Sequence, residues 1–389
     1  MGQLASYATP RRQNATQVSE VVFTNAKIVT RSECFNGTVQ IIDGVIVDIT
    51  SGKTTASGAL DFDGDHLLPG LIDVHTDHLE KQILPRAGVT WDPLAAAIAH
   101  DIQLCSAGTT TVFDSLIVGA MGNPERRRLL PIMLEGLDEA RRHGLLRADH
   151  LLHLRCDARE PRLVDLFLAH ADHSELRFVT IMDDGPRRDP NRFRYLERRK
   201  NTPELEIEAA ISAVASTEDC TEENRRRLVA LCRARGLPFA SHDDTTAAQI
   251  AEAVTYGLAI SEFPITLEAA KAARAAGMTI IVGGPNLVAG RSHIGNVSVR
   301  ELAQNGLVDI ISSDYIPSSI LRAIWHLADQ SDGPTLAEAV ALGSLRPAET
   351  FGLADRGEIA PGKRADLIRV ADRAGPIVRA VWTVGRQVL

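Results

Sequence analysis

The strongest constraint on how this chain folds is its alternation of short apolar runs with longer helical segments. Eight runs have the composition of strands buried on both faces. They end at residues 73–75, 111–114, 152–155, 179–182, 238–241, 259–262, 280–283 and 310–313. Strands that alternate with helices predict a parallel sheet. Eight such units over about 260 residues predict an α/β TIM (β/α)8 barrel.

An open doubly wound sheet is the alternative to the barrel. That fold usually has fewer strands, and often a glycine-rich phosphate loop after the first one. Here the first strand is followed by His75-Thr-Asp77-His78 instead. The helix boundaries also fit the barrel, because Asp92 before Pro93 predicts a helix start and Thr335 with Glu338 predicts a capping box.

Both ends of the chain have the character of short strands. Residues 21–70 hold β-rich runs broken by Asn-Gly and Asp-Gly turns, and two further runs follow a turn-rich stretch after residue 355. Each piece is too small to fold alone. We therefore expect one small composite β-domain from residues 21–70 and 355–389, with the barrel over residues 71–354. Residues 1–20 are polar, and we expect a disordered leader there.

Composition and charge exclude several classes of protein. The 389 residues suffice for one large catalytic domain and a small satellite domain. A net charge of -8 argues against a nucleic-acid partner. The five cysteines are widely spaced and include no C-x-x-C pair, which favours a reducing cytoplasm. No apolar run is long enough to span a membrane. We expect a cytoplasmic protein with a small-molecule partner.

The predicted strand ends carry the candidate chemistry, since the active site of a TIM barrel lies at the carboxyl ends of its strands. The polar groups at these ends are His75, Asp77, His78, Asp114, Asp157, Asp183, Asp184, His242, Asp243, Asp244, Glu262, Asn286 and Asp314. Carboxylates that converge on one mouth repel each other, and divalent cations usually neutralise them. Imidazole with carboxylate suits zinc, manganese or iron, whereas carboxylate alone suits magnesium. The pattern predicts a centre of one or two divalent ions.

Structural roles compete with ligand roles at several of these positions. We expect Asp114 to be the N-cap of the next helix, and for Glu262 the two roles stay equally open. His242 lies in a run that is too polar for a barrel core, which favours a role as a metal ligand. A buried Asp314 at the mouth would need a partner, which favours the same role. Packing or surface roles are expected for His66, His143, His170, His173 and His326.

Two loops indicate an anionic substrate. The glycine-rich loop 283–293 follows the seventh strand and ends in Arg291, Ser292 and His293, which are phosphate-type donors. The loop after the fourth strand, residues 186–200, holds six arginines and one lysine, and such a cluster at the mouth would focus a polyanion. A merely solvated loop is the alternative. Lys81 and Arg86 would add to the same field.

Residues 68–77 resemble the first-strand signature of the amidohydrolase superfamily, and residues 357–366 resemble its return into the C-terminal β-domain. Further stretches resemble a branch of that superfamily that acts in phosphonate breakdown. They are residues 75–77, 152–156, 240–244, 262–264, 285–286, 292–293 and 312–315. The resemblance implies a metal-dependent hydrolase that releases diphosphate from a sugar 5-triphosphate and leaves the 5-phosphate.

The resemblance also implies residue roles. His75 and Asp77 correspond to metal ligands on the first strand, and His242 and Glu262 to ligands on the fifth and sixth. Asp157 stands where the family has a carboxylate that is usually Glu. Asp314 corresponds to a ligand that is also the general base, with His242 as a second catalytic group. Zinc is the first expectation for the metal. The expected substrate-binding residues are Lys81, Arg86, Asp183, Asn286, Arg291, Ser292 and His293.

Departures from the family pattern surround the substrate. Position 78 is His where Asn is usual, position 184 is Asp where His is usual, and the lid after the fourth strand is shorter and more basic. A close phosphorylated analogue therefore stays open as the substrate. A C–N hydrolase such as a cyclic amidase or deaminase is the alternative activity, because fold does not fix function. A non-catalytic relic without its metal is a third reading. A homo-oligomer also stays open.

Overall fold

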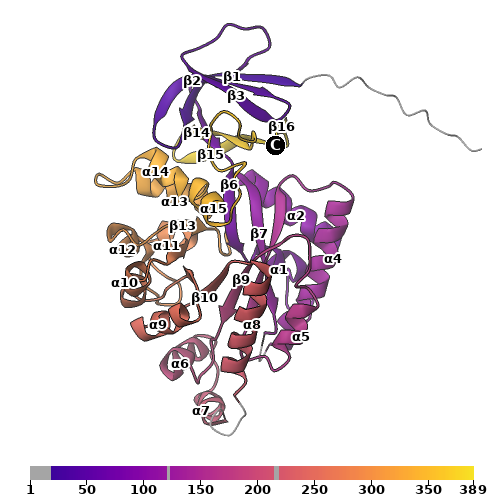
Figure 1. The fold of residues 1–389 in the computed structure, drawn as a ribbon, viewed down its shortest axis with the longest axis vertical. Coiled ribbons are helices and arrows are strands. Elements are labelled where there is room, and N and C mark those ends of the chain that lie inside the picture. The colour runs from indigo at the N-terminus through magenta and orange to yellow at the C-terminus, as the bar shows by residue number, and fades with distance from the viewer. Residues whose placement is uncertain (1–18, 121–122, 214–218) are drawn as a thin grey trace, which may run out of the picture.

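The protein is described from a computed structural model that covers residues 19–120, 123–213 and 219–389. Two eight-stranded sheets organise these residues (Figure 1). A large helix-covered parallel sheet forms the body of the molecule. A smaller sheet, coloured indigo and yellow because it comes from both ends of the chain, lies above it.

The large sheet is a nearly closed barrel. Its strands are β6 (Leu71–Thr76), β7 (Thr109–Val118), β8 (Asp149–Asp157), β9 (Leu176–Met182), β10 (Phe239–His242), β11 (Ile260–Glu262), β12 (Thr279–Gly283) and β13 (Ile310–Ser312). Each pairs in parallel with the next strand along the chain. A parallel bridge between Thr76 and Asp314 brings the first and last strands together. The predicted TIM barrel is confirmed, and all eight predicted runs are strands.

Fifteen helices lie in the described part of the chain. They are α1 (His78–Ile83), α2 (Pro93–Ser106), α3 (Pro124–Arg127), α4 (Leu129–Arg142), α5 (Leu163–Leu168), α6 (Pro190–Arg199), α7 (Glu204–Ala213), α8 (Thr221–Arg235), α9 (Ala247–Thr255), α10 (Leu267–Ala275), α11 (Gly284–Ala289), α12 (Val299–Gln304), α13 (Ser319–Ala328), α14 (Leu336–Ala341) and α15 (Leu345–Thr350). Both predicted helix starts are confirmed: Asp92 caps α2 by accepting from the Ala95 amide, and Thr335 forms a capping box with Glu338.

The small sheet is built from both ends of the chain. Its strands are β1 (Glu20–Val29), β2 (Cys34–Ile42), β3 (Val45–Ser51), β4 (Leu60–Asp61), β5 (His66–Pro69), β14 (Leu367–Asp372), β15 (Pro376–Thr383) and β16 (Arg386–Gln387). Strand β5 pairs antiparallel with β14, so the expected composite sheet is confirmed. Residues 1–18 of the predicted leader lie outside the described residues, and β1 begins at Glu20. The domain boundaries stay predictions.

The packing of aromatic rings explains why neither end of the chain would form the small β-domain alone. Trp382 from the C-terminal end packs against two N-terminal rings, with centroids 4.7 Å from Phe23 and 5.9 Å from Phe62. All three side chains are at most 4% exposed. Removing either end would uncover these rings, and burial of a large side chain is worth about 1.5–3 kcal/mol.

Charge pairs also join the two parts of the molecule. Arg356 and Arg364, which precede β14, bond to the Asp149 carboxylate at the start of β8 over 2.6 and 2.7 Å. The C-terminal segment is thereby tied to the amino end of the barrel, opposite the mouth. Among the described residues, no helix is long and apolar enough to cross a membrane.

Candidate active site at the barrel mouth

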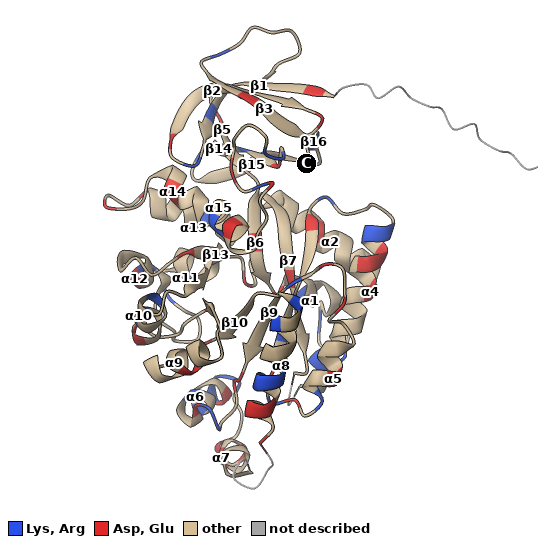
Figure 2. Ribbon diagram, viewed as in Figure 1, with Lys and Arg blue, Asp and Glu red and all other residues tan. Residues whose placement is uncertain are grey.

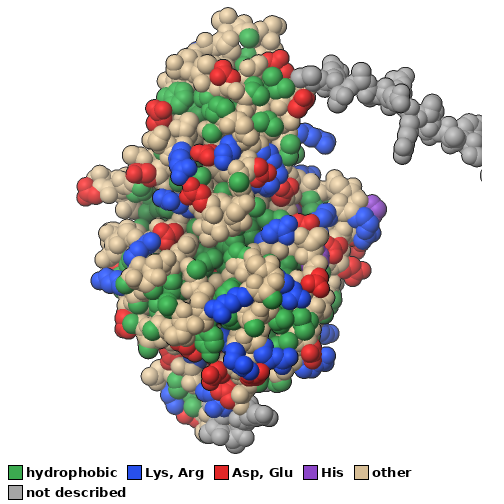
Figure 3. Space-filling model, in the orientation of Figure 1, with side chains coloured by type: hydrophobic (Ala, Val, Ile, Leu, Met, Phe, Trp, Pro, Cys, Tyr) green, Lys and Arg blue, Asp and Glu red, His purple; other side chains and the backbone are tan. Residues whose placement is uncertain are grey.

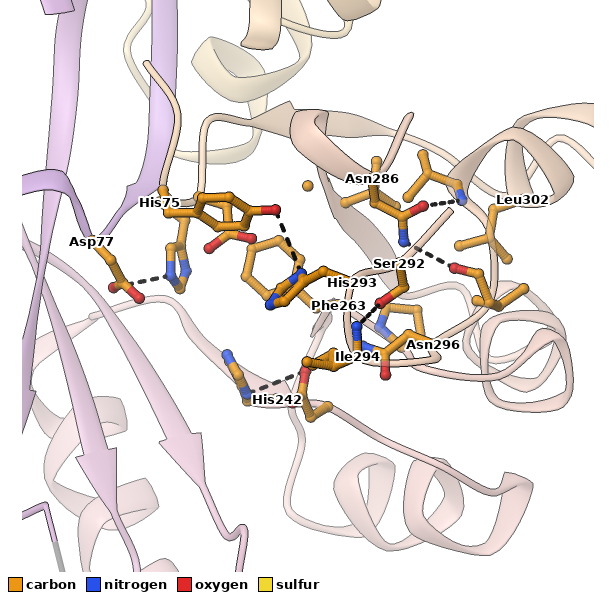
Figure 4. A pocket seen from close by; sticks show the side chains of 18 of the residues that line it. His75, Asp77, His242, Phe263, Asn286, Ser292, His293, Ile294, Asn296 and Leu302 are labelled. Atoms are coloured by element: carbon orange, nitrogen blue, oxygen red, sulfur yellow. Dashed lines mark hydrogen bonds and ion pairs between the residues drawn. The ribbon is translucent and has the colours of Figure 1, made fainter. Parts of the chain in front are cut away.

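A cavity of about 260 Å³ lies at the carboxyl ends of the strands (Figure 4). One side is polar and carries the strand-end groups His75, Asp77, Arg155, His242, Asp243 and Asp314. The rest of the lining combines apolar side chains, namely Phe263, Pro264, Val282, Val297, Val299 and Leu302, with polar side chains from the loop after β12. The site therefore offers a charged surface beside a wall of mixed character, in the location that the fold predicts.

Three strand-end side chains form the compact centre of this surface. One ligand atom each of His75, Asp77 and Asp314 lies within 4.8 Å of the other two. His75 Nε2 is 3.6 Å from Asp77 Oδ1. The buried Nδ1 of His242, on the same cavity wall, has no hydrogen-bond partner among the described residues. An imidazole with two carboxylates fits a divalent metal. His242 Nδ1 lies 3.6 Å from Asp243 Oδ1, so this imidazole faces a second carboxylate of the mouth.

The backbone at the mouth holds these groups in strained positions. Asp243, Phe263 and Asp314, which follow β10, β11 and β13, have φ angles of 55°, 55° and 56°. Non-glycine residues adopt this left-handed region at a cost of roughly 1 kcal/mol or more each. Asp314 is also fixed to β6: its amide donates to the His75 carbonyl over 2.9 Å, and its carbonyl accepts from the Asp77 amide over 2.7 Å.

Glu262 is turned toward His75 and does not line the cavity. Its Oε1 is 2.8 Å from His75 Nδ1, and its Oε2 accepts from the Thr180 hydroxyl over 2.9 Å. Burial raises the pKa of this carboxyl, but the charges of His75 and His153 outweigh burial and hold the pKa well below its ordinary value. This contact directs His75 Nε2 toward Asp77, the arrangement by which carboxylates commonly orient metal-binding imidazoles.

Arg155 on β8 is a site residue that the sequence reasoning missed. It is 8% exposed, and its guanidinium donates to Asp77 Oδ1 and lies 3.4 Å from His242 Nε2. Burial would raise the pKa of Asp77, but the charge of Arg155 holds it well below its usual range. A cation among apolar strand residues was the available signal, because a buried charge needs a partner.

Asp314 has the opposite environment to Asp77. Burial is the main cause that raises its pKa to about 6, and the negative charges of Asp77 and Asp243 add to this. His75 and Arg155 act in the other direction. Two neighbouring carboxyls with separated pKa values suit different roles, and a carboxylate that titrates close to neutrality suits proton transfer.

The N-cap prediction for Asp114 is wrong. Strand β7 continues past it to Val118, so Asp114 lies in the middle of the strand and is 0% exposed. Its two oxygens bond to different imidazoles, Oδ1 to His100 Nε2 over 2.7 Å and Oδ2 to His150 Nδ1 over 2.8 Å. His78 Nδ1 continues this network 3.0 Å from His100 Nδ1. Both carboxylate oxygens of Asp114 take part in hydrogen bonds, so Asp114 belongs to a buried network of carboxylate and imidazole groups.

Three of the predicted substrate-binding residues line the cavity, namely Asn286, Ser292 and His293. Asn286 shapes the loop, since it donates to the Val297 carbonyl and accepts from the Val299 amide, each over 3.0 Å. Lys81 lies at the rim, where its ammonium donates to the Tyr315 carbonyl over 3.3 Å.

Other predicted residues are not brought to the cavity. Asp157 forms a two-pronged ion pair with Arg159 over 2.9 and 2.8 Å, and it does not line the cavity with His75 and Asp77. Asp183 pairs with Arg225 over 3.3 Å in a neighbouring, smaller hollow. The exposed Arg86 and Arg291 are likewise absent from the cavity lining. For Asp157 and Asp183, ion pairs with arginines set the direction of the carboxylate, which strand-end position alone did not fix.

The basic lid is largely neutralised within the molecule. Five of its seven cations pair with carboxylates: Arg187 with Asp219, Arg188 with Asp244 and Glu252, Arg194 with Glu208, Arg198 with Glu204, and Lys200 with Glu197. Basic and acidic side chains are correspondingly interspersed on α6 and over the visible face (Figures 2 and 3). Among the described residues, Arg192 and Arg199 are the cations of this loop that form no ion pair with a carboxylate. The positive field that was expected to attract a polyanion therefore comes mainly from these two.

Comparisons with known proteins agree with this architecture. Residues 200–388 match the model of the Amidohydrolase family. The chain is 38% identical over 379 residues to the alpha-D-ribose 1-methylphosphonate 5-triphosphate diphosphatase of Escherichia coli (strain K12), an alignment that covers 95% of this chain and 100% of that relative.

Solved structures share the fold at low identity. N-isopropylammelide isopropylaminohydrolase from Burkholderia multivorans ATCC 17616 superposes with a TM-score of 0.63 at 15% identity, over 95% of this chain and 98% of that one. N-acetylglucosamine-6-phosphate deacetylase from Pasteurella multocida gives 0.61 at 12% identity, over 95% and 99%. These similarities concern the fold alone.

Proposed function

Since the chain belongs to the amidohydrolase family, a family of metal-dependent hydrolases, we propose that it releases diphosphate from alpha-D-ribose 1-methylphosphonate 5-triphosphate or a close phosphorylated analogue. The observation that carries this proposal is the 38% identity to the Escherichia coli diphosphatase along nearly the whole chain. The paired Asp77 and Asp314 at the barrel mouth, with their separated pKa values, support the same chemistry.

The proposed metal ligands are His75, Asp77 and Asp314, with His242 on the same cavity wall as a further proposed ligand. We expect zinc first, with manganese, iron or magnesium as alternatives, and one or two ions. A divalent cation there would supply a Lewis acid that lowers the pKa of water and offsets negative charge on a phosphoryl group. Asp157 and Glu262 stay proposed ligands, although Asp157 forms an ion pair with Arg159 and Glu262 contacts His75.

The chain's own groups supply proton transfer and charge. In the proposed reaction, Asp314 accepts the proton of the attacking water, since its pKa of about 6 leaves it mostly ionised yet basic near neutrality. Arg155 keeps Asp77 ionised and adds a fixed positive charge beside the reacting phosphoryl group. His242 lies next to Arg155 on the cavity wall, which supports its role as a second catalytic group.

The loop after β12 supports recognition of the leaving group. Asn286 fixes this loop through its hydrogen bonds to the backbone of Val297 and Val299. Ser292 and His293 of the same loop line the cavity. Hydroxyl and imidazole groups are suitable donors to phosphate oxygens. Lys81 remains a proposed rim contact, whereas Arg86, Asp183 and Arg291 lack a place in the cavity lining and have weaker support.

We also propose a cytoplasmic location. All five cysteines lie in the described part of the chain, three of them are buried, and none forms a disulfide. Free thiols persist in reducing compartments.

Phosphorus NMR of the metal-loaded protein with the ribose triphosphate named above tests the proposed reaction. We expect signals of diphosphate and of a 5-monophosphate, both lost when a chelator is added. Ammonia or a ring-opened acid from cyclic amides, with the triphosphate left intact, would instead identify a C–N hydrolase. A purified protein that takes up no metal would support the non-catalytic alternative.

A further inference from the structure

The four arginines of α6 divide into two kinds by their partners. Arg194 and Arg198 pair with Glu208 and Glu204 of α7, each over 2.6 Å. Among the described residues, neither Arg192 nor Arg199 forms an ion pair with a carboxylate. These two arginines are seven residues apart, so they lie on one face of the helix. The charges that α6 leaves uncompensated are therefore gathered on a single face.

That face lies against the loop that carries Ser292 and His293. Arg192 donates to the Ile294 carbonyl over 3.2 Å. A Cβ at Gly295 would lie 2.6 Å from the Tyr195 hydroxyl, so helix and loop are in close contact. Both guanidinium groups flank the Tyr195 ring, 5.8 Å from its centroid for Arg192 and 5.9 Å for Arg199. The packing holds both cations beside the cavity loop.

Arg192 also has an unused donor. Its second terminal nitrogen is buried and has no hydrogen-bond partner among the described residues. A buried donor without an acceptor is unfavourable, and more so when the group is charged. An anion with several acceptor oxygens would satisfy this donor and the neighbouring charges together.

One further cation, Lys81, faces the same place across the rim. Lys81 lies 4.9 Å from the centroid of the Tyr315 ring, and the Tyr315 hydroxyl is 3.4 Å from His293 Nδ1. After burial, the positive charges of Arg199, Arg192 and Lys81 are what lower the pKa of His293. Their combined effect on one imidazole shows that these charges converge at the edge of the cavity.

We propose that Arg192, Arg199 and Lys81 form a binding site for the outer phosphates of a polyphosphate chain, with His293 between that site and the cavity. The site rests on the proposed function and deepens it, because it predicts selection for a triphosphate over a monophosphate. Outer phosphates held at α6 place the inner phosphoanhydride bond over Asp77 and Asp314. The released diphosphate is then the group that the arginines bind.

Binding of inorganic tripolyphosphate to the full-length, metal-stripped protein tests this site without catalysis. Isothermal titration calorimetry compares the unaltered protein with R192A, R199A and R198A. Arg199 and Arg198 are adjacent and both exposed, but only Arg198 has a carboxylate partner, so R198A is the matched control. We expect R192A and R199A each to weaken binding on the order of tenfold, and R198A to change it less than twofold.

Several outcomes would overturn the site. Equal losses for R198A and R199A would mean a diffuse field, and unchanged affinity in R192A and R199A would mean that the arginines do not contact the anion. R199K separates charge from geometry, since lysine retains the charge but lacks the two-pronged contact, and we expect an intermediate affinity. Circular dichroism melts identify a variant that fails to fold.

Failure of the site and failure of the proposed function are distinguishable. If tripolyphosphate binds through Arg192 and Arg199 but the ribose triphosphate is not hydrolysed, the anion site stands and the proposed reaction fails. If the ribose triphosphate is hydrolysed with the same KM in R192A, R199A and the unaltered protein, the reaction stands and the anion site is wrong.

Discussion

Two aspartates at the barrel mouth differ in their ease of ionisation because their neighbours differ. Asp77 faces the guanidinium of Arg155, and Asp314 is buried and faces the charges of Asp77 and Asp243. One carboxyl therefore stays charged, and the pKa of the other is raised to about 6. This separation of two similar groups by environment is the residue-scale basis of the proposed chemistry.

The variant D314N tests the role of Asp314. Asn tolerates the left-handed backbone at this position, where φ is 56°, so the fold should persist. It cannot accept a proton from water, and we expect turnover to fall by about 10²–10⁴-fold. Rates of diphosphate release, with thermal melts as the check on folding, measure this. Near-full activity in D314N would remove Asp314 from the mechanism.

The buried network around Asp114 predicts a pH dependence of stability. The charge of Asp114 overcomes burial and raises the pKa of His150 from 6.5 to about 9. The stability that His150 contributes is thus complete below pH 6.5 and lost as the pH rises through about 9. The pKa of Asp114 is lowered from 3.8, so its contribution is complete above pH 3.8 and lost in more acidic solution. We expect this network to stabilise most between these limits.

Chemical unfolding of D114N at pH 6, 7.5 and 9 measures the network. D114N removes one of the two carboxylates that contact His150 and leaves the other, Asp101, so we expect a loss of about 1.5–3 kcal/mol at pH 6. The loss should shrink toward pH 9, where His150 of the unaltered protein also gives up its proton. A difference between the two proteins that stays constant from pH 6 to pH 9 would contradict the assignment of the shifted pKa to this pair.

At the scale of helices and loops, close contacts set which side chains reach the mouth. Helix α6 rests on the loop after β12 through Tyr195 and Gly295, and helix α2 meets α4 where Pro93 faces Gly136. In both places a glycine permits a closer approach than a side chain would, of the Pro93 backbone at Gly136 and of the Tyr195 side chain at Gly295. Helix α1 packs against both α2 and α4, so its position depends on how closely these two helices approach.

The variant G136A tests the contact between α2 and α4. A Cβ at this position would overlap the Pro93 carbonyl, so the helices must separate. Although Ala favours helix more than Gly, we expect a net loss of about 1–3 kcal/mol from overpacking. E135A, on the exposed side of α4, is the control and should change stability little. Increased stability of G136A in urea unfolding would show that the helices are not in tight contact.

The elements were more predictable from the sequence than the directions of single side chains. All eight barrel strands follow from apolar runs, because a strand buried on both faces has little choice of composition. Asp114 was misjudged because the residues after it are also apolar and extend β7. The partners of Arg194 and Arg198 lie on α7, and no local pattern in the sequence reveals that proximity.

The same limit applies to the site. Strand-end position brought His75, Asp77, His242 and Asp314 to one cavity, since parallel strands present their carboxyl ends together. It did not bring Asp157 into the lining of that cavity, because Asp157 forms an ion pair with Arg159. Arg155 was overlooked because its role in the site depends on its contact with Asp77, which is 78 positions away in the sequence.

At the scale of the whole molecule, the two chain ends close over the amino side of the barrel and leave the mouth open. Asp149 connects the C-terminal segment to the barrel, since Arg356 and Arg364 both donate hydrogen bonds to it. In D149A two partly buried guanidinium groups lose their shared acceptor, and we expect a loss of about 1.5–3 kcal/mol. Catalytic rates at 25 °C should not change, because the mouth lies at the other end. A large loss of kcat at unchanged stability would contradict this separation.

The central claim is that the barrel mouth hydrolyses a phosphoanhydride with a divalent metal held by His75, Asp77 and Asp314. The most direct test is diphosphate release from the ribose triphosphate by chelator-treated protein, titrated with zinc or manganese while bound metal is measured by elemental analysis. The account predicts no release without metal and a rate that rises to a plateau at one or two ions per chain. Full release by protein that contains no metal, or none from protein with its metal bound, would contradict it.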